Sequence, residues 1–188
     1  MVALKHYNSL GGEWNIPDDI IEGLFIRMKD EGKDSFSFPG DGEPETPEQF
    51  RKVFQFGIES LYLVYADDGK VMGFVWLNRF EHKLARIHFC SFDGFGLAEK
   101  IEAAEYVSDY VLSLKDDDGY IFDVLEGRIA SGNMAAQMLV SAAGFIKTGF
   151  VPHGSFNRSK GISEDAVIYC KTRKTTNNNS KQVIYKKR

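Results

Sequence analysis

Apolar and polar residues recur along the chain with spacings that predict both helices and strands. Near the N-terminus, Pro17 opens a helix whose first turn is acidic and whose apolar positions recur at helical spacing until Gly32. Thr46-Pro47-Glu48-Gln49 is a capping box, which predicts a second helix over about Pro47 to Glu59. The segment from Lys33 to Glu45 is dense in Gly, Pro and Asp and is predicted to be a loop.

Strand patterns occupy the middle of the chain. The apolar runs LYLVYA and VMGFVWLNRF flank Asp67-Asp68-Gly69-Lys70, the turn chemistry of an antiparallel hairpin. A third strand is predicted over about Leu84 to Phe92, and it ends at the turn Asp93-Gly94-Phe95-Gly96. Apolar residues at helical spacing from Leu97 onward predict a helix of about 17 residues after that turn.

The C-terminal third begins with a predicted strand over Tyr120 to Leu125, within YIFDVLEG. Asn133 to Ala143 is predicted to be a short helix closed by Gly144. IKTGFVP and DAVIYCKT are predicted to be two late strands. We expect one domain over residues 1–173, followed by a basic, disordered tail over residues 174–188.

The chain has 188 residues, of which 43% are hydrophobic, enough for one domain with a substantial core. Its two cysteines, Cys90 and Cys170, offer no disulfide framework, so we expect a reducing, cytoplasmic setting. No apolar run approaches the roughly 18 residues that a membrane helix needs. We therefore expect no membrane partner.

The net charge of −4 is distributed unevenly. From Lys171 to Arg188 there are seven Lys or Arg and no acid, so residues 1–170 carry 16 basic groups against 27 acidic ones, a net charge of −11. An acidic body lacks the basic footprint from which nucleic-acid affinity begins. Nucleic acid remains an alternative partner only for the basic tail.

The order of the predicted elements, with Asn133-Met134-Ala135-Ala136-Gln137 and Ala143-Gly144-Phe145, resembles the GNAT superfamily of N-acetyltransferases. The resemblance covers about Leu61 to Lys171. It implies an α/β (α+β) fold with a central mixed, mostly antiparallel sheet of about 6–7 strands and helices on both faces. It also implies that the sheet splays between the Leu84–Phe92 and Tyr120–Leu125 strands to form a cofactor cleft.

The resemblance further implies acetyl-CoA as co-substrate and a small-molecule or peptide amine as acceptor. A Gly-rich turn before a helix presents backbone N–H groups to a pyrophosphate, and the edge of the preceding strand can pair with pantetheine amides. The residues expected to bind the cofactor are Phe89, Cys90, Ser91, Asp93, Gly94, Phe95, Gly96, Leu97, Ala98 and Asn133. Asn133 has an alternative role, because asparagine is also a preferred helix cap.

Two segments, the glycine-rich loop and the last helix, depart from the family pattern. The phosphate loop of the family usually begins with a Gln or Arg and often has another basic residue before its first glycine, where this chain has Ser91 and Asp93. We therefore expect Asp93 to weaken binding of the pyrophosphate. Val140 stands seven residues after Asn133, where many members have a Tyr that protonates the departing thiolate. General acids contribute about 10²–10⁴ in rate, so slow transfer remains an expectation.

His88 and Glu126 are the candidate catalytic residues, as bases for the attacking amine, with Asp123 as a competitor. The alternatives are a histidine hydrogen-bonded at the core margin and solvated or capping carboxylates. His82 and His88 share a strand face but lack cysteine or carboxylate companions, so we expect no metal site.

The leading hypothesis is therefore an acetyl-CoA-dependent N-acyltransferase. The alternative is a non-catalytic GNAT-like binding or structural module of phage origin, which Asp93 and Val140 favour. The acidic body favours cationic acceptors.

Overall fold

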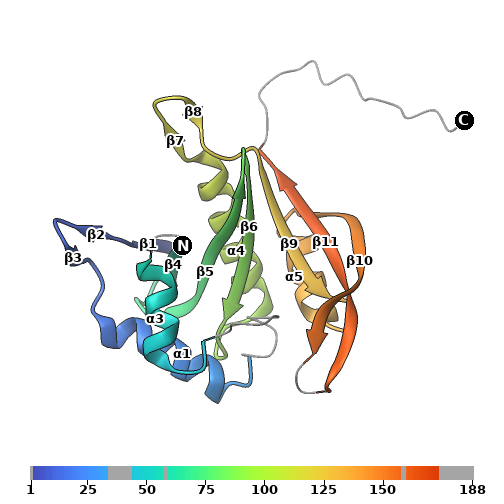
Figure 1. Ribbon diagram of the computed structural model, residues 1–188, viewed down its shortest axis with the longest axis horizontal. Helices are drawn as coiled ribbons and strands as arrows, with labels where there is room; N and C mark the ends of the chain where they lie inside the picture. Colours follow the sequence, from blue (N-terminus) through green and yellow to red (C-terminus); the bar gives the residue numbers. More distant parts are fainter. Residues whose placement is uncertain (1, 34–43, 57–58, 158–159, 174–188) are drawn as a thin grey trace, which may run out of the picture.

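The computed structural model describes residues 2–33, 44–56, 59–157 and 160–173, and they form one seven-stranded sheet with helices on both faces (Figure 1). The strand order is β1-β4-β5-β6-β9-β11-β10. The strands are β1 (Ala3–Tyr7), β4 (Ser60–Tyr65), β5 (Val71–Glu81), β6 (Leu84–Ser91), β9 (Val124–Ala130), β10 (Ile146–Asn157) and β11 (Ile162–Thr172).

The sheet is mixed and mostly antiparallel, as predicted. The β6–β9 pair is parallel, whereas the other neighbouring pairs in the described sheet are antiparallel. β6 and β9 pair at three positions, Leu84 with Val124, Ala85 with Leu125 and Arg86 with Glu126. Beyond these positions the strands diverge (Figure 1), which confirms the predicted splay although β9 begins later than expected.

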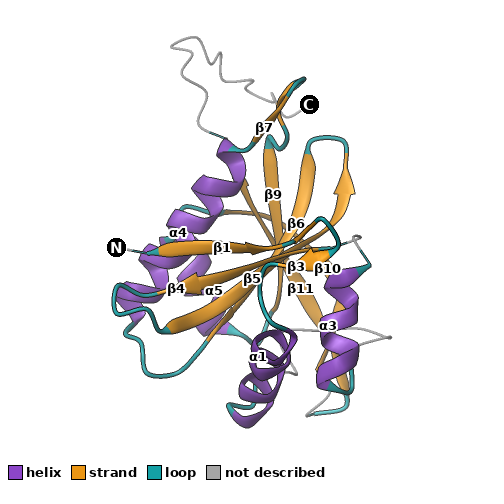
Figure 2. Ribbon diagram, turned by 90° about the vertical axis from the view of Figure 1, so that its left-hand side faces the viewer, coloured by secondary structure: helices purple, strands orange, loops and turns teal. Residues whose placement is uncertain are grey.

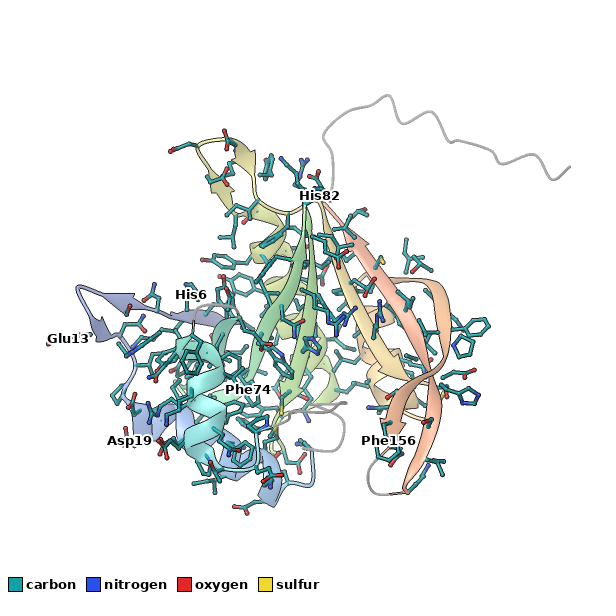
Figure 3. All side chains as sticks on the ribbon, in the orientation of Figure 1. His6, Glu13, Asp19, Phe74, His82 and Phe156 are labelled. Atoms are coloured by element: carbon teal, nitrogen blue, oxygen red, sulfur yellow. The ribbon has the colours of Figure 1, made fainter. Side chains whose placement is uncertain are left out.

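Of the helices that the structure describes, two cover each face of the sheet (Figure 2). On one face, α1 (Asp18–Asp30) and α3 (Pro47–Gln55) bury an aromatic-rich core that includes Phe50, Phe74 and Trp76. On the other face, α4 (Leu97–Ser113) and α5 (Met134–Ala142) bury a mainly aliphatic core. Figure 3 shows Phe74 on the α1 and α3 side, and Phe156 at the lower end of β10, across the gap between the two halves.

Local signals in the sequence placed most of these elements. The Thr46 hydroxyl accepts a hydrogen bond from the Gln49 N–H (3.2 Å) at the start of α3, and Asn133 caps α5 in the same way. Gly69 and Gly144 have φ values of 79° and 88°, which favour glycine in the hairpin turn and after α5. Helix α4 begins at the predicted residue.

Two predicted boundaries are wrong. α3 ends at Gln55 rather than near Glu59, because β4 begins at Ser60. The strand predicted over Tyr120–Leu125 is displaced, since β9 runs over Val124–Ala130 and Tyr120 belongs to a small hairpin. The apolar residues before β9 instead cross the end of the sheet, where buried Phe122 stacks on Phe80 with ring centroids 5.9 Å apart.

The small hairpin is formed by β7 (Lys115–Asp116) and β8 (Gly119–Tyr120). The N-terminal strands were not predicted. β1 pairs with β4 at the sheet edge, and β2 (Ser9–Leu10) pairs with β3 (Glu13–Trp14). β1 is short and carries Lys5 and His6 between apolar residues, so its pattern is weak.

Most of the predicted loop over Lys33 to Glu45 lies outside the described residues, and so does the predicted tail from residue 174 onward. Among the described helices, none combines the length and the apolar character needed to cross a membrane.

Candidate functional site

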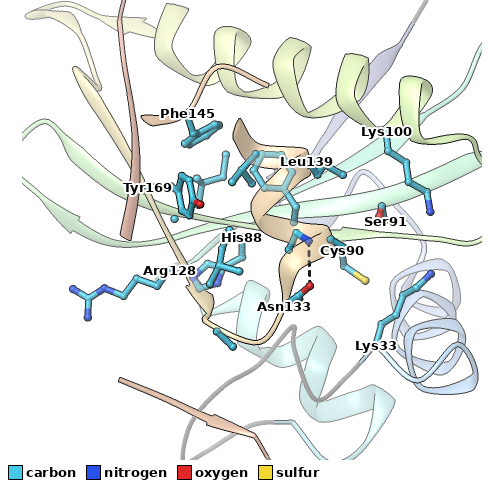
Figure 4. Close-up of a pocket in the computed structure, with 18 of the residues that line it drawn as sticks. Lys33, His88, Cys90, Ser91, Lys100, Arg128, Asn133, Leu139, Phe145 and Tyr169 are labelled. Atoms are coloured by element: carbon cyan, nitrogen blue, oxygen red, sulfur yellow. Dashed lines mark hydrogen bonds between the residues drawn. The ribbon is translucent and has the colours of Figure 1, made fainter. Parts of the chain in front are cut away.

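The divergence of β6 and β9 leaves a cleft of about 420 Å³ in the middle of the sheet (Figure 4). Its walls come from β6, β9, the start of α4, the inner side of α5 and the ends of β10 and β11. Residues 87–91 of β6 pair with β5 on one side and have no partner in β9 on the other. This edge therefore offers backbone N–H and C=O groups to a ligand.

One end of the cleft lies at the N-terminus of α4. Leu97 and Lys100 line it, and Lys33, just beyond the end of α1, lies across from them (Figure 4). The first turn of a helix carries unpaired N–H groups and the positive end of the helix dipole. With two lysines beside it, this end of the cleft fits an anionic group.

Asp93 has charged partners that the sequence analysis did not identify. Its carboxylate forms an ion pair with Lys33 (Oδ1 to Nζ, 2.7 Å), and the hydrogen bond from Lys33 lowers the pKa of Asp93. Its backbone is held as well, because Glu31 accepts from the Asp93 N–H (2.8 Å) and Arg27 donates to the Asp93 carbonyl (3.1 Å). Asp93 is therefore neutralised locally, so the expected repulsion of a pyrophosphate is weakened.

The structure brings six of the ten predicted cofactor residues to the cleft. The lining includes Phe89, Cys90, Ser91, Phe95, Leu97 and Asn133. Asp93 and Gly94 instead line a neighbouring cavity, while Gly96 and Ala98 lie outside the described lining of the cleft. Gly94 has φ of 92°, so glycine is required there for the turn rather than for contact with the cleft.

Asn133 acts as a helix cap, the alternative that the sequence left open. Its Oδ1 accepts a hydrogen bond from the Ala136 N–H (3.1 Å), drawn as a dashed line in Figure 4. The same residue lines the cleft. The cap thus fixes the start of α5 against the space between the strands.

His88 lies in the cleft wall but is a weak candidate for a base. Its ring stacks on Trp76 (centroids 4.5 Å apart, planes at 6°), and burial, with Arg86 and Arg79 nearby, lowers its pKa to about 3. Asn78 donates an amide N–H to Glu59 (3.2 Å), so its Oδ1 faces His88 Nε2 (3.1 Å). Nε2 therefore carries the proton, and His88 is neutral at physiological pH.

Glu126 and Asp123, the other candidate bases, are both engaged by arginines. Arg86 and Arg128 donate to the same oxygen, Oε1 of Glu126, at 3.1 and 2.9 Å. Asp123 is bound by Arg173 (2.9 Å). Of these residues Arg128 lines the cleft, whereas the two carboxylates lie outside its described lining. Neither carboxylate is placed to take a proton from a ligand in the cleft.

Sequence reasoning missed six polar residues that line the cleft, which are Lys33, Lys100, Arg128, Ser155, Asn157 and Tyr169. Tyr169 lines the cleft, and its hydroxyl donates to Gln137 Oε1 (3.3 Å). Tyr169 packs in the same core cluster as Val140, the position where the family pattern has a tyrosine. No motif marks Tyr169, because β11 approaches α5 through the tertiary structure.

The arrangement of the possible metal ligands is the remaining feature of interest at the site. Within the described ranges, no three or more His, Cys, Asp or Glu side chains are grouped closely enough to hold a metal ion.

No protein-family model and no curated protein matches the chain by sequence. Solved structures do match it. A mutant of spermidine N-acetyltransferase SpeG from Vibrio cholerae superimposes with a TM-score of 0.67 at 15% identity, covering 90% of this chain and 94% of that chain. Ribosomal-protein-S5-alanine acetyltransferase from Vibrio fischeri gives 0.63 at 15% identity, over 84% and 90% of the two chains.

A third match is RimL, a ribosomal L7/L12 α-N-protein acetyltransferase in complex with coenzyme A. It gives a TM-score of 0.64 at 16% identity, over 83% of this chain and 88% of that chain. These similarities show that the chain has the fold of the GNAT acetyltransferases.

Proposed function

We propose that this chain transfers the acetyl group of acetyl-CoA to an amine. The observation that carries the proposal is the cleft itself, which opens where the parallel pair β6–β9 diverges and ends at the first turn of α4. RimL, whose fold is similar, is a protein acetyltransferase in complex with coenzyme A. The unpaired edge of β6 and the lysines beside the start of α4 support the same ligand for this chain.

Each part of the cleft suits one part of the co-substrate. The unpaired edge of β6 over residues 87–91 would bind the pantetheine amides as a neighbouring strand would. The N-terminus of α4, with Lys33 and Lys100, would hold the pyrophosphate. Phe95, Leu139 and Phe145 give the cleft apolar walls that limit the access of water.

Acetyl-CoA supplies a thioester whose carbonyl carbon is attacked by the neutral amine. The new C–N bond forms, the C–S bond breaks, the nitrogen loses a proton and the thiolate gains one. Backbone N–H groups on the β6 edge would stabilise the oxyanion that develops on the carbonyl oxygen. Tyr169 would donate the proton to the sulfur, in place of the tyrosine that Val140 replaces.

The amine must reach the thioester without its extra proton. His88, with its pKa near 3, and Glu126, bound by two arginines, are poor acceptors for that proton. The proton would therefore pass to solvent water at the open side of the cleft. Acceptors whose ammonium group has a low pKa suit this arrangement best.

The alternative is a module that binds coenzyme A without transferring an acyl group. Val140 at the family's tyrosine position and the engaged state of Glu126 favour it. The two functions share the same cleft and differ in whether Tyr169 and an acceptor complete the reaction.

Titration calorimetry with acetyl-CoA, followed by an assay of thiol release over a panel of amines, tests the proposal. We expect a Kd on the order of 1–10 μM, since Lys33 offsets Asp93, and release of free CoA with at least one amine. Binding without release for every amine would establish the non-catalytic alternative. Absence of binding at millimolar acetyl-CoA would overturn both.

A further inference from the structure

Three arginines gather on the sheet beside the end of the cleft that lies away from α4. Arg86 of β6 pairs in register with Glu126 of β9, and Arg128 follows two residues later, on the same face of that strand. Arg79 lies near the end of β5. Burial lowers the pKa of both Arg86 and His88, and the charges of neighbouring arginines, Arg79 among them, lower it further. We call Arg79, Arg86 and Arg128 the arginine cluster.

The described residues leave the arginine cluster short of negative charge. Arg86 and Arg128 share one oxygen of Glu126, and Arg79 has neither an ion pair nor a hydrogen bond among the described residues. Arg86 and Arg128 thus share one carboxylate, and Arg79 adds a positive charge without an ion pair among the described residues. The described lining of the cleft adds no Asp or Glu.

Arg128 connects the arginine cluster to the cleft. It lines the cleft, and its side chain is 36% exposed, whereas that of Arg86 is 13% exposed. Its Nε is used by Glu126, which leaves the terminal N–H groups to a ligand. In Figure 4 the Arg128 guanidinium points away from Lys33 and Lys100, so the two positive ends of the cleft are separate.

Resting on the proposed acetyl transfer, we propose that the arginine cluster binds the acceptor, and that this acceptor is an α-amine whose own molecule carries a carboxylate. Guanidinium groups recognise carboxylates through paired hydrogen bonds. This class of acceptor replaces the cationic acceptors favoured by the acidic body, because the charge beside the reaction site outweighs the distant net charge. Two sources share this chemistry, a free amino acid and a peptide with an acidic N-terminal residue.

The positive surroundings also suit the chemistry of an α-amine. Nearby cations favour the neutral form of a bound amine, and no described residue in the cleft is a strong proton acceptor. An α-amino group has a reference pKa of about 7.7–8.0, whereas a lysine-type amine has about 10.4. An α-amine is therefore available for attack at neutral pH in a much larger fraction of molecules.

The experiment compares four acceptors with the full chain and saturating acetyl-CoA. They are L-glutamate, an amidated tripeptide beginning with Glu, the same tripeptide beginning with Gln, and spermidine. We expect glutamate or the glutamyl peptide to exceed the glutaminyl peptide at least about tenfold in kcat/KM, with spermidine lowest. The stronger of the two carboxylate acceptors identifies the source.

Three variants locate the effect. Arg128→Gln and the exposed Arg79→Gln should bring the preference for Glu over Gln close to one, while the melting temperature and the acetyl-CoA affinity stay unchanged. Arg86 is left intact because it is mostly buried against Glu126. Lys115→Gln, which removes a positive charge from the β7–β8 hairpin, outside the described lining of the cleft, is the matched control and should keep the preference.

The outcomes separate this inference from the proposed function. If acetyl groups are transferred but the glutaminyl peptide or spermidine is preferred, or if Arg128→Gln lowers all acceptors equally, the arginine cluster is not the acceptor subsite. If nothing is acetylated, the proposed function fails. Calorimetry with the glutamyl and glutaminyl peptides then tests the acceptor subsite by itself. Preferential binding of the glutamyl peptide that is lost in Arg128→Gln supports the subsite, and no such preference overturns it.

Discussion

Lys33 and Asp93, 60 residues apart in the chain, form an ion pair in which Nζ and Oδ1 are 2.7 Å apart. The pair ties the end of α1 to the loop that precedes α4. It places the positive member at the cleft and the negative member outside it. The negative charge of Asp93, which in the sequence disfavours a phosphate at the loop before α4, is thereby offset by Lys33.

We predict that Lys33→Gln weakens acetyl-CoA binding by about threefold to tenfold. The change removes one positive charge and takes that partner from two carboxylates, Glu31 and Asp93. Both effects are screened by solvent because the Lys33–Asp93 pair is partly exposed. Asp93→Asn should leave binding unchanged or tighten it. Calorimetry on both variants measures the difference, and equal weakening by the two would show that the pair matters only for the shape of the loop.

We predict that Tyr169→Phe lowers acetyl transfer by about 10²-fold, because the hydroxyl that would protonate the sulfur is lost. The acetyl-CoA affinity should stay within about twofold, since the aromatic ring remains. Tyr106→Phe, at an exposed position on α4, is the control and should not change the rate. An unchanged rate in Tyr169→Phe would remove this residue from the proposed chemistry.

We predict that His88 makes the fold sensitive to acid. Burial lowers the pKa of His88 from its ordinary value of 6.5 to about 3 in the native chain. As pH falls, the unfolded state therefore binds the proton before the native state does. The stability it contributes is complete above about pH 6.5 and declines by up to about 1.4 kcal/mol per pH unit towards pH 3.

Urea denaturation of wild type and His88→Gln across this range measures the His88 effect. The wild-type free energy of unfolding should fall more steeply, and parallel pH profiles would contradict the prediction. His6, whose pKa is also lowered by burial, contributes equally to both proteins and cancels in the comparison.

We predict the opposite pH dependence for Glu59. Burial raises its pKa, and its Oε2 is buried without a hydrogen-bond partner among the described residues. The native state therefore retains the proton longer than the unfolded state, and stability is lost as pH rises above about 4.5. The melting temperature of Glu59→Gln relative to wild type should increase from pH 4 to pH 8. A constant difference would show that the carboxyl titrates normally.

The elements that sequence reasoning found are those with local signals. Pro17, Thr46 and Gly69 each mark a boundary through their own backbone chemistry. β1 was missed because its partner, β4, is distant in the sequence and its own pattern is mixed. β9 was displaced because Phe122 is as apolar as a strand residue but packs against Phe80 beyond the sheet.

The candidate site was predicted only where one segment carries it. The β6 edge and the start of α4 are contiguous in sequence, and the structure places much of that segment at the cleft. Lys33, Arg128 and Tyr169 reach the cleft from three other elements, and their role depends on how the sheet is assembled. The pKa of His88 depends on burial and on arginines from two strands, which no spacing rule reveals.

The two halves of the sheet meet at a junction no wider than three residue pairs, with Ala85 and Leu125 fully buried at its middle. The angle at which β6 and β9 diverge is therefore fixed by the packing of these few residues. Each residue adds about 3.3 Å to the length of a strand. A small change of the angle between β6 and β9 therefore displaces their far ends more than the residues near the junction. A bulkier side chain at position 85 would change that angle. The width of the cleft near Ser91 thus depends on side-chain packing at the opposite end of β6.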